Sequence, residues 1–253
     1  MDTLLFQLQG PLSSWGEAAV GEYRPTADYP GQSAMLGLLA AALGIDRADQ
    51  AAQRGLQDSY RMAVGVISPG RLLRDFHTAQ VPSRADLKKR PHATRRDELA
   101  LPKTDLNTIL STRDYRQDGA IVVALQAQEG AYYTLAQLAE ALKRPRFVLY
   151  LGRKSCPLAA PLHPVIADAA TIAEAMRTYV QDLANQWNER VPGKPVPVPT
   201  LQRLAWGDDI GSDEVSVIGH TRHFSTVRKD MVLARQGWQF GDRREHIALL
   251  EEE

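Results

Sequence analysis

Residues 145–158 read PRFVLYLGRKSCPL, an apolar run followed by a glycine and two cations. Residues 147–151 are apolar, β-branched or aromatic throughout, which predicts a short buried strand. We expect that strand to end at Gly152, because glycine tolerates positive φ and lets another backbone approach closely. Pro157 prevents further ladder pairing because it has no N–H. The stretch therefore predicts a strand that leads into a tight turn.

That turn carries Arg153, Lys154 and Ser155, two cations and a hydroxyl. Charged side chains beside the backbone N–H groups of a turn suit an anion such as a phosphate. The same three residues are also typical of a solvated surface turn, and this alternative stays open at this point.

The composition is that of an ordinary globular protein, and it does not indicate a binding partner. A chain of 253 residues buries about 70–75% of its unfolded surface, so it needs no disulfide or metal to be stable. Lys plus Arg number 30 and Asp plus Glu number 30, so any nucleic-acid surface must come from local clustering. One large domain or two small ones are both compatible with this length.

The cellular compartment is predicted from what the sequence lacks. Cys156 is the single cysteine, which excludes an intramolecular disulfide and fits a reducing compartment. The chain does not open on a basic segment with a long apolar core, and its longest apolar run, 34–42, is too short to span a bilayer. We therefore expect a soluble cytoplasmic protein that makes no membrane contact.

Hydrophobic periodicity predicts alternating strands and helices over most of the chain. A turn at Gly10-Pro11 is expected to end the first strand. Ser33 is expected to cap the first helix, which Gly44 ends. The expected strands are 3–9, 60–68, 71–79 (a hairpin with 60–68), 119–128 and 215–226, and the expected helices are 34–43, 48–56, 134–143 (capped by Thr134) and 169–187.

The periodicity fails over residues 80–117, where the chain becomes basic. Between 76 and 117, nine Lys or Arg residues, Arg113 among them, stand against five acidic residues, a local balance of +4. A long basic segment with few apolar residues inside a compact domain is either disordered or functional. A solvated loop is the alternative interpretation.

Without that segment, the predicted order approximates a β-α-β-β-α-β arrangement with one strand to spare. We therefore predict an α+β fold with a ferredoxin-like (RRM-like) core over residues 1–160. A C-terminal extension packed on the core is expected at 161–253. Cores of this class often hold single-stranded RNA on the sheet face.

Motifs for catalysis or metal binding are not evident in the sequence. His220 and His223 would face opposite sides of a strand, and no cysteine or acid completes a ligand set, so we expect no metal and no other cofactor. The chain has neither a GxxxxGK[ST] phosphate loop nor a GxSxG elbow. For His77, where a strand leads into the basic segment, a contact with RNA or a capping role is expected ahead of a general base.

Several ordered motifs together resemble the CasD family, the small RNA-capping subunit of the type I-E CRISPR surveillance complex, Cascade. Each motif alone is weak, but their order over about 160 residues is specific. The motifs are Gly10-Pro11 with Trp15-Gly16, Arg24-Pro25-Thr26, Pro30 to Ser33, Gly37-Leu38-Leu39 with Leu43-Gly44-Ile45, Arg74-Asp75-Phe76-His77-Thr78, and Tyr150 to Pro157.

The resemblance implies a non-catalytic subunit that binds and caps the 5′ handle of the guide RNA (crRNA) in antiviral defence. It implies that the basic segment, at about 76–117, is a long β-hairpin or thumb inserted in the core. It also implies partners, namely the backbone subunits and the large subunit of Cascade, with target DNA contacted only indirectly. The RNA-binding residues that we expect on this sequence are Arg24, Pro25, Thr26, Ser33, His77, Arg113, Tyr150, Gly152, Arg153, Lys154 and Ser155.

Two other functions stay open. A metal-independent endoribonuclease that processes precursor crRNA would use His77, Lys88 or Lys89, and Tyr115 as an acid–base set. A general RNA chaperone would bind RNA without belonging to a fixed assembly.

Overall fold

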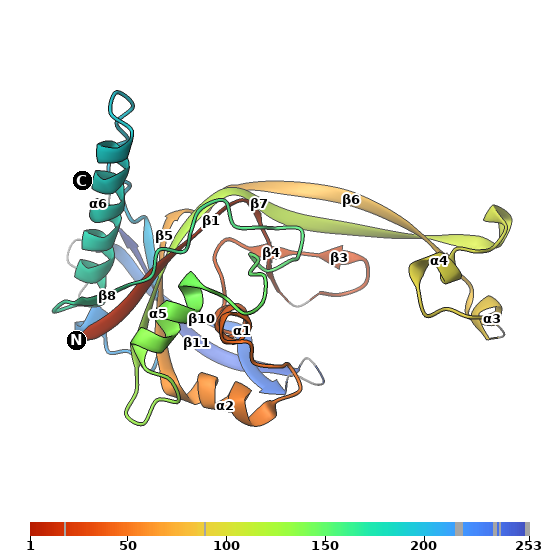
Figure 1. Cartoon of the computed structure of the whole chain (residues 1–253), viewed down its shortest axis with the longest axis horizontal. Helices are drawn as coiled ribbons and strands as arrows, with labels where there is room; N and C mark the ends of the chain where they lie inside the picture. Colours follow the sequence, from red (N-terminus) through yellow and green to blue (C-terminus); the bar gives the residue numbers. More distant parts are fainter. Residues whose placement is uncertain (18, 89, 216–219, 235–236, 238, 251–253) are drawn as a thin grey trace.

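One antiparallel sheet organises the chain, and its two interior strands β1 (Asp2–Ser13) and β7 (Leu106–Ala127) pair with each other (Figure 1). The computed structural model describes residues 1–17, 19–88, 90–215, 220–234, 237 and 239–250. Within this part, the strand order is β10–β11–β9–β5–β7–β1–β8, and neighbouring strands are antiparallel. The remaining strands of this path are β5 (Tyr60–Ser68), β8 (Val165–Asp168), β9 (Arg203–Gly207), β10 (His220–Ala234) and β11 (Gln239–Leu250).

Successive side chains of β1 point to opposite faces of the sheet, and they contribute to two hydrophobic cores, one on each face. Leu4, Phe6 and Leu8 are buried on one face, in the core that also holds buried residues of α1, α2 and α5. Leu5 is buried on the opposite face, in the core to which α6 contributes. These helices are α1 (Gln32–Leu43), α2 (Gln50–Ser59), α5 (Leu135–Lys143) and α6 (Ile172–Arg190).

Most of the predicted helices are confirmed, but the cap of the first one is not Ser33. The N-cap of α1 is Gly31, and the N–H of Gln32 donates instead to the Asp230 carboxylate at 2.8 Å. The C-terminal end is as predicted, since Gly44 adopts φ 78° and closes the helix. Ser33 lies two residues after the N-cap, inside the first turn, and the Asp230 carboxylate supplies the acceptor that a capping side chain would otherwise provide.

The prediction of a buried strand at 147–151 is wrong. Phe147 and Val148 are 53% and 86% exposed, and only a single bridge, Tyr150 to Pro157, forms there. The N–H of Phe147 donates to the carbonyl of Ala41 at the end of α1 instead of entering a ladder. The physical reason lies in β1, which pairs with β7 along one edge. Along its other edge, β8 pairs with Asp2 to Leu5, and the segment 159–162 bonds to Gln7 and Gln9.

The predicted turn at Gly10-Pro11 is also wrong, because β1 continues to Ser13. Gly10 pairs with Gly119 and Leu12 with Gln117, so the ladder with β7 runs past the proline. Pro11 is tolerated because β8 pairs with β1 only as far as Leu5, which leaves the other edge free of ladder bonds at that point. Beyond it, the short strands β2 (Trp15–Gly16) and β4 (Thr26–Ala27) pair with each other.

The basic segment forms an arm that projects from the body of the molecule (Figure 1). β6 (Arg71–Pro82) pairs with the first half of β7, from Arg71↔Gln117 to Pro82↔Leu106, so the expected hairpin with β5 is wrong. Periodicity failed here because an exposed two-stranded ribbon buries neither face and so carries no alternating apolar pattern. The end of the arm, between these strands, holds α3 (Arg84–Leu87), α4 (Arg95–Glu98) and a 3₁₀ turn at Lys103–Asp105.

The C-terminal hairpin of β10 and β11 packs against the segment that leads into α1. Arg243 donates to Asp230 at 2.9 and 3.0 Å and to Glu245 at 2.7 Å. Tyr29 donates its hydroxyl to Glu245 at 2.6 Å, and Arg228 donates to the Tyr29 carbonyl at 3.1 Å. This buried network fastens residues 29–32 to the hairpin. The strand predicted at 215–226 corresponds to the start of β10, with 216–219 outside the described residues.

We predict that Asp230→Ala lowers the free energy of unfolding by about 3–5 kcal/mol, because it leaves the buried Arg243 with one of its two carboxylate partners, Glu245, and removes the acceptor of the first N–H of α1. Burial would raise the Asp230 pKa, but the hydrogen bonds and charge of Arg243 hold it below its ordinary value. A carboxyl with a lowered folded-state pKa stabilises above about pH 4, and that stabilisation is lost as the pH falls through the folded pKa.

Urea unfolding at pH 7 and pH 3 measures this effect, with Asp182→Ala on the exposed face of α6 as the matched control. The gap between wild type and Asp230→Ala should be wide at pH 7 and narrower at pH 3, and the control should stay within about 0.5 kcal/mol of wild type. An equal gap at both pH values would show that the network charge contributes nothing.

Candidate nucleic-acid interface

Three of the predicted cations meet where the arm joins the body. β3 (Tyr23–Arg24) pairs in parallel with β7, so that Arg24 lies beside Arg113. From the turn after residue 151, Arg153 donates to the carbonyl of Asp114 at 3.4 Å and to the carbonyl of Arg24 at 3.3 Å. The structure therefore brings together Arg24, Arg113 and Arg153 from three separate segments.

Arg153 is held in a fixed position by its neighbours. Its guanidinium lies 4.8 Å from the ring centroid of Tyr115, which is a cation–π contact. The side chain is half-buried, and Tyr115 beneath it is buried. Two guanidinium nitrogens are used for carbonyls, so Arg153 offers an outside anion its charge and its remaining N–H groups.

His77 belongs to the same face of the arm as Arg113 and Tyr115. Side chains directly opposite in an antiparallel pair share a face, and the register is His77↔Ser111, Asp75↔Arg113 and Leu73↔Tyr115. His77 is exposed, and Arg113 is half-buried with the acidic Asp75 across from it. Toward the body, this face of the ribbon therefore carries an imidazole, then a cation, then an aromatic ring.

The opposite face of the ribbon holds a polar cluster that sequence analysis did not single out. Arg74 donates to the two oxygens of Asp114 at 2.9 and 3.1 Å, and the Tyr23 hydroxyl donates to Asp114 at 2.5 Å. Hydrogen bonds from Arg74 hold the pKa of the Asp114 carboxyl below its ordinary value, and the bond to Asp114 raises the pKa of Tyr23. Arg74 belongs to the motif at 74–78, but Asp114 and Tyr23 are 40 and 51 residues away in the chain, so the sequence does not link them to it.

The turn at 150–157 is shaped by contact with the chain after β1. Gly152 adopts φ +86°, and a Cβ there would lie 1.8 Å from the carbonyl oxygen of Ser14. The N–H of Ser14 donates to the carbonyl of Leu151 at 3.0 Å, and the N–H of Cys156 donates to that of Arg153 at 2.9 Å. The glycine is thus required for close packing on the protein's own backbone.

The side chains of this turn divide into exposed and buried ones. Tyr150, Lys154 and Ser155 are exposed. Cys156 is a free, fully buried cysteine, and burial raises the pKa of its thiol, so the residue packs as a small apolar group. Lys154 therefore presents its ammonium group at the surface beside the fixed Arg153.

The predicted residues of the 24–33 segment have different surroundings. Thr26 is buried, and its hydroxyl accepts from the N–H of Trp15 at 2.8 Å and donates to the carbonyl of Ala27 at 2.9 Å. Pro25 and Ser33 are half-buried, with Ser33 in the first turn of α1. Arg24 is exposed, and it donates to the carbonyls of Gly21 and Tyr23 at 2.5 and 3.1 Å. Of these four residues, Arg24 is the one whose side chain is exposed to solvent.

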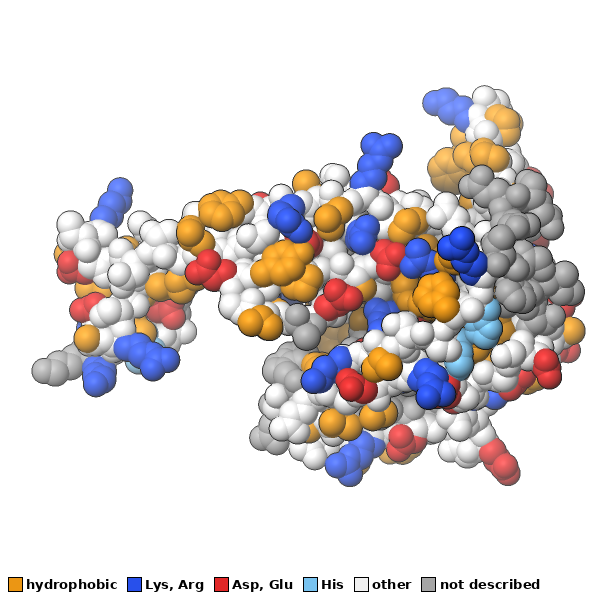
Figure 2. All heavy atoms as spheres, turned by 180° about the vertical axis from the view of Figure 1, so that it is seen from behind, with side chains coloured by type: hydrophobic (Ala, Val, Ile, Leu, Met, Phe, Trp, Pro, Cys, Tyr) orange, Lys and Arg blue, Asp and Glu red, His pale blue; other side chains and the backbone are white. Residues whose placement is uncertain are grey.

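Apolar and cationic side chains alternate along the outside of the arm. Figure 2 shows hydrophobic groups interspersed with Lys and Arg along one face of the arm and over the adjoining body. Leu72, Phe76 and Ile109 on the ribbon are 51%, 64% and 48% exposed. Among these, the Phe76 ring beside cations offers stacking and charge together, the combination found where proteins bind single strands.

Two further properties of the described residues bear on the chemistry. They contain no group of three or more His, Cys, Asp or Glu side chains placed to hold a metal ion. None of the described helices is long and apolar enough to cross a membrane.

A family model described as CRISPR-associated protein (Cas_Cas5) matches residues 3–244. The chain belongs to this family. The chain is also 30% identical to the CRISPR system Cascade subunit CasD of Escherichia coli (strain K12) over 252 residues, which covers 96% of this chain and 94% of the relative. These two matches confirm the resemblance inferred from the ordered sequence motifs.

Two solved structures resemble the whole chain. One, entitled CRISPR RNA-guided surveillance complex, has a TM-score of 0.63 and 25% identity, and the match covers 98% of this chain and 90% of that one. The other, a crystal structure of a Cas protein, has a TM-score of 0.58 and 27% identity, with 98% and 95% covered. The arm and the C-terminal hairpin therefore lie within the part of this Cas_Cas5 chain that has structural counterparts.

We predict that Gly152→Ala lowers the free energy of unfolding by about 3 kcal/mol or more, because it adds a steric clash to an unfavourable backbone conformation. Gly193→Ala is the matched control. Gly193 has φ +91° with nothing within 4 Å of the added Cβ, so it carries the conformational cost alone, about 1–2 kcal/mol. Chemical denaturation of both variants measures the difference. Equal losses would mean that the turn can move away from Ser14 without cost.

Proposed function

We propose that this chain is the non-catalytic subunit that binds and caps the 5′ handle of crRNA in a CRISPR surveillance complex of the Cascade type. One observation carries the proposal: Arg24, Arg113 and Arg153 converge where β3, the arm and the 150–157 turn meet. Three cations from separate segments form a site for a phosphate backbone, which positions RNA without reading its sequence.

The surroundings of this cluster support single-stranded RNA as the ligand. Lys154 adds an exposed ammonium, and Tyr150 adds an exposed ring, 38% accessible, on the same turn. His77 extends the surface along the arm. Cations that follow a backbone and rings that stack on bases are the recurrent elements of single-strand binding. Ser155, Pro25, Ser33 and the glycine complete the proposed site as residues that shape its backbone.

The strand order supports a ferredoxin-like core for this function. β5, β7, β1 and β8 are adjacent and antiparallel, and α1 and α5 contribute to the core on one face. This is the order expected of a β-α-β-β-α-β unit whose fourth strand is β8. We propose the core as residues 1–168 less the arm, which moves the predicted boundary near 160 past β8, with the thumb at about 76–117.

The proposed partners follow from the relatives. The CasD relative is a Cascade subunit, and one structural neighbour is an RNA-guided surveillance complex. We therefore propose that the chain links the backbone subunits to the large subunit, touches target DNA only through them, and acts in the cytoplasm.

We predict that Lys154→Ala weakens handle binding and reduces the slope of log affinity against log salt by about 0.7, the value for one phosphate contact on a single strand. The exposed Lys194 on the proline-rich segment gives the control, Lys194→Ala, which should leave both affinity and slope unchanged. Fluorescence anisotropy with a labelled handle RNA over a salt series measures the slopes. A slope that Lys154→Ala leaves unchanged would remove the phosphate role of the turn.

The endoribonuclease alternative needs His77, Tyr115 and a lysine together, and the geometry does not favour that set. His77 and Tyr115 are four residues apart along the ribbon by register, which is about 13 Å. Tyr115 is buried beneath Arg153, Lys88 lies on the far end of the arm, and Lys89 is outside the described residues.

We predict that the purified protein does not cut its repeat RNA in the absence of metal, and that His77→Ala weakens binding without altering the RNA length. General acid–base cleavage requires both groups within hydrogen-bond reach of the reacting atoms. Gel analysis of end-labelled repeat RNA with wild type and His77→Ala checks this. A product at the handle boundary that His77→Ala abolishes would favour the endoribonuclease instead.

A further inference from the structure

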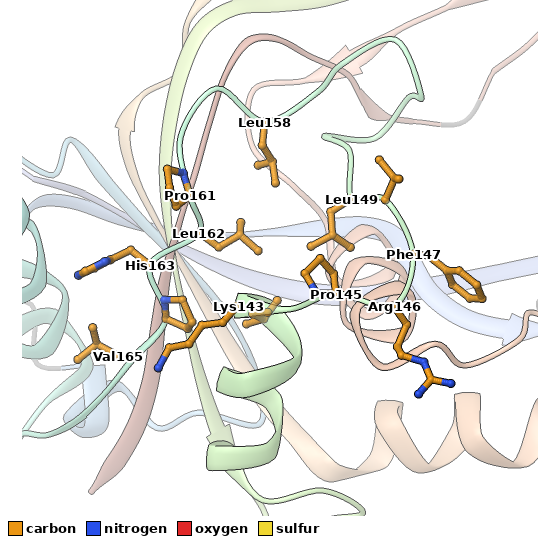
Figure 3. Close-up of a pocket in the computed structure, with 13 residues that line it drawn as sticks. Lys143, Pro145, Arg146, Phe147, Leu149, Leu158, Pro161, Leu162, His163 and Val165 are labelled. Atoms are coloured by element: carbon orange, nitrogen blue, oxygen red, sulfur yellow. The ribbon is translucent and has the colours of Figure 1, made fainter.

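An apolar groove lies at the sheet edge, away from the cation cluster. It has a volume of about 780 Å³ and runs between the end of α5, the segment 145–149 and the segment 158–165 (Figure 3). Leu149, Leu158 and Leu162 turn toward its interior from these two segments. This volume falls in the range of clefts that bind ligands or peptide side chains.

The rim of the groove exposes apolar side chains that the fold itself does not use. Val148 is 86% exposed and Phe147 is 53% exposed, although Leu149 and Leu151 in the same run are buried. Across the groove, Val165 is 38% exposed. A cluster of large exposed apolar side chains around a concavity is characteristic of an interaction site.

Beside the groove, the sheet ends in an open edge. β8 is the last strand of the sheet order and pairs only with β1 among the described residues, from Asp2↔Asp168 to Leu5↔Val165. Its other edge therefore presents backbone N–H and C=O groups without a ladder partner in the described part of the chain. Ile166, in the middle of this strand, is 41% exposed. An open edge of this kind is a template for an added strand.

The charges that line the groove indicate what kind of segment would bind there. Its ionisable lining residues are Lys143, Arg146 and His163, and no Asp or Glu lines it. Lys143 and Arg146 are exposed, and the acid in the last turns of α5, Glu140, pairs with Arg144 instead. The nearest end of the chain, the N-terminal amine, is paired with Asp168 at 2.6 Å at the far end of β8. Charge complementarity therefore favours an acidic occupant.

The backbone that leads into β8 is fixed before any partner arrives. His163 adopts φ 48°, an uncommon conformation for a residue with a side chain. The Tyr179 hydroxyl donates to the His163 carbonyl at 2.8 Å and thereby holds this kink in place from α6. Because the kink sets where β8 begins, the edge and the groove keep one relative orientation, which lowers the entropic cost of docking.

We infer that β8 and this groove bind an extended segment of another protein subunit. The segment adds as a strand to the free edge of β8, inserts alternate apolar side chains into the groove and places a carboxylate near Lys143, whose side chain extends toward the β8 end of the groove (Figure 3). The identity of the partner as a subunit of the same complex rests on the proposed function, whereas the site itself rests on the groove and the edge.

The test uses the full-length chain co-expressed with the other protein subunits encoded in its CRISPR locus. Val148→Asp is chosen because its side chain is almost fully exposed, so the variant should fold normally. It should weaken binding of one subunit about tenfold or more, since it places a like-charged, polar group against the docked segment. The control is Val227→Asp on β10, 67% exposed and at the opposite edge of the sheet, which should not change assembly.

Two measurements identify the occupant. A photoreactive phenylalanine analogue at position 148 should cross-link to an extended segment of one subunit that has apolar residues two apart and a flanking acid. Hydrogen exchange should show slower exchange of amides 165–168 in the assembly than in the free chain, as strand addition requires. Cross-links to RNA or to a second copy of this chain, or unchanged exchange at 165–168, would overturn the inference.

A handle-binding assay on the free variant separates the two proposals. If Val148→Asp assembles like wild type while both bind the handle RNA, the docking inference fails and the proposed function stands. If wild type assembles but does not bind the handle, the proposed function fails, and the cross-link then decides the docking site independently.

Discussion

The hydrogen-bond ladder of β7 is the constraint on which the rest of the structure depends. Along one edge this strand pairs with β1 and then with β3, and along the other it pairs with β5 and then with β6. The change from β5 to β6 occurs near Asp118 and Gly70, which adopt φ 56° and 69°. One continuous strand therefore belongs to the hydrophobic core at one end and to the exposed arm at the other. It fixes the arm to the body, because a two-stranded ribbon alone is only marginally stable.

The candidate RNA surface follows from this ladder and from two sets of contacts that hold flanking segments against it. Parallel pairing of β3 places Arg24 beside Arg113, and the 150–157 turn brings Arg153 onto Tyr115 because Gly152 can pack on Ser14. The buried network of Arg243, Asp230 and Glu245 then fastens the loop after β4 to the C-terminal hairpin. That network explains why a hairpin remote in sequence belongs to the same folding unit, since its carboxylate also accepts the first N–H of α1.

Local signals in the sequence predicted individual helices and strands well, but they did not predict which of several distant segments pairs with a given strand edge. The strand at 60–68 and the Thr134-capped helix follow from period and capping, and both are confirmed. Residues 147–151 have the composition of a strand, yet β8 and the segment 159–162 bond to the second edge of β1, and the N–H of Phe147 donates to α1 instead. The motifs predicted Arg24 and Arg153 as site residues, but the partnership of Arg74, Asp114 and Tyr23 depends on a ladder register that composition does not encode.

The central claim is that segments 23–26, 111–116 and 150–156 form one surface for the 5′ handle. Photo-cross-linking of the purified chain to repeat RNA that carries 4-thiouridine in the handle, followed by mass spectrometry of the cross-linked peptides, tests it most directly. The account predicts cross-links from all three segments, competed away by unlabelled handle RNA. Cross-links confined to α6 or to the hairpin of β10 and β11, with none from the three segments, would contradict it.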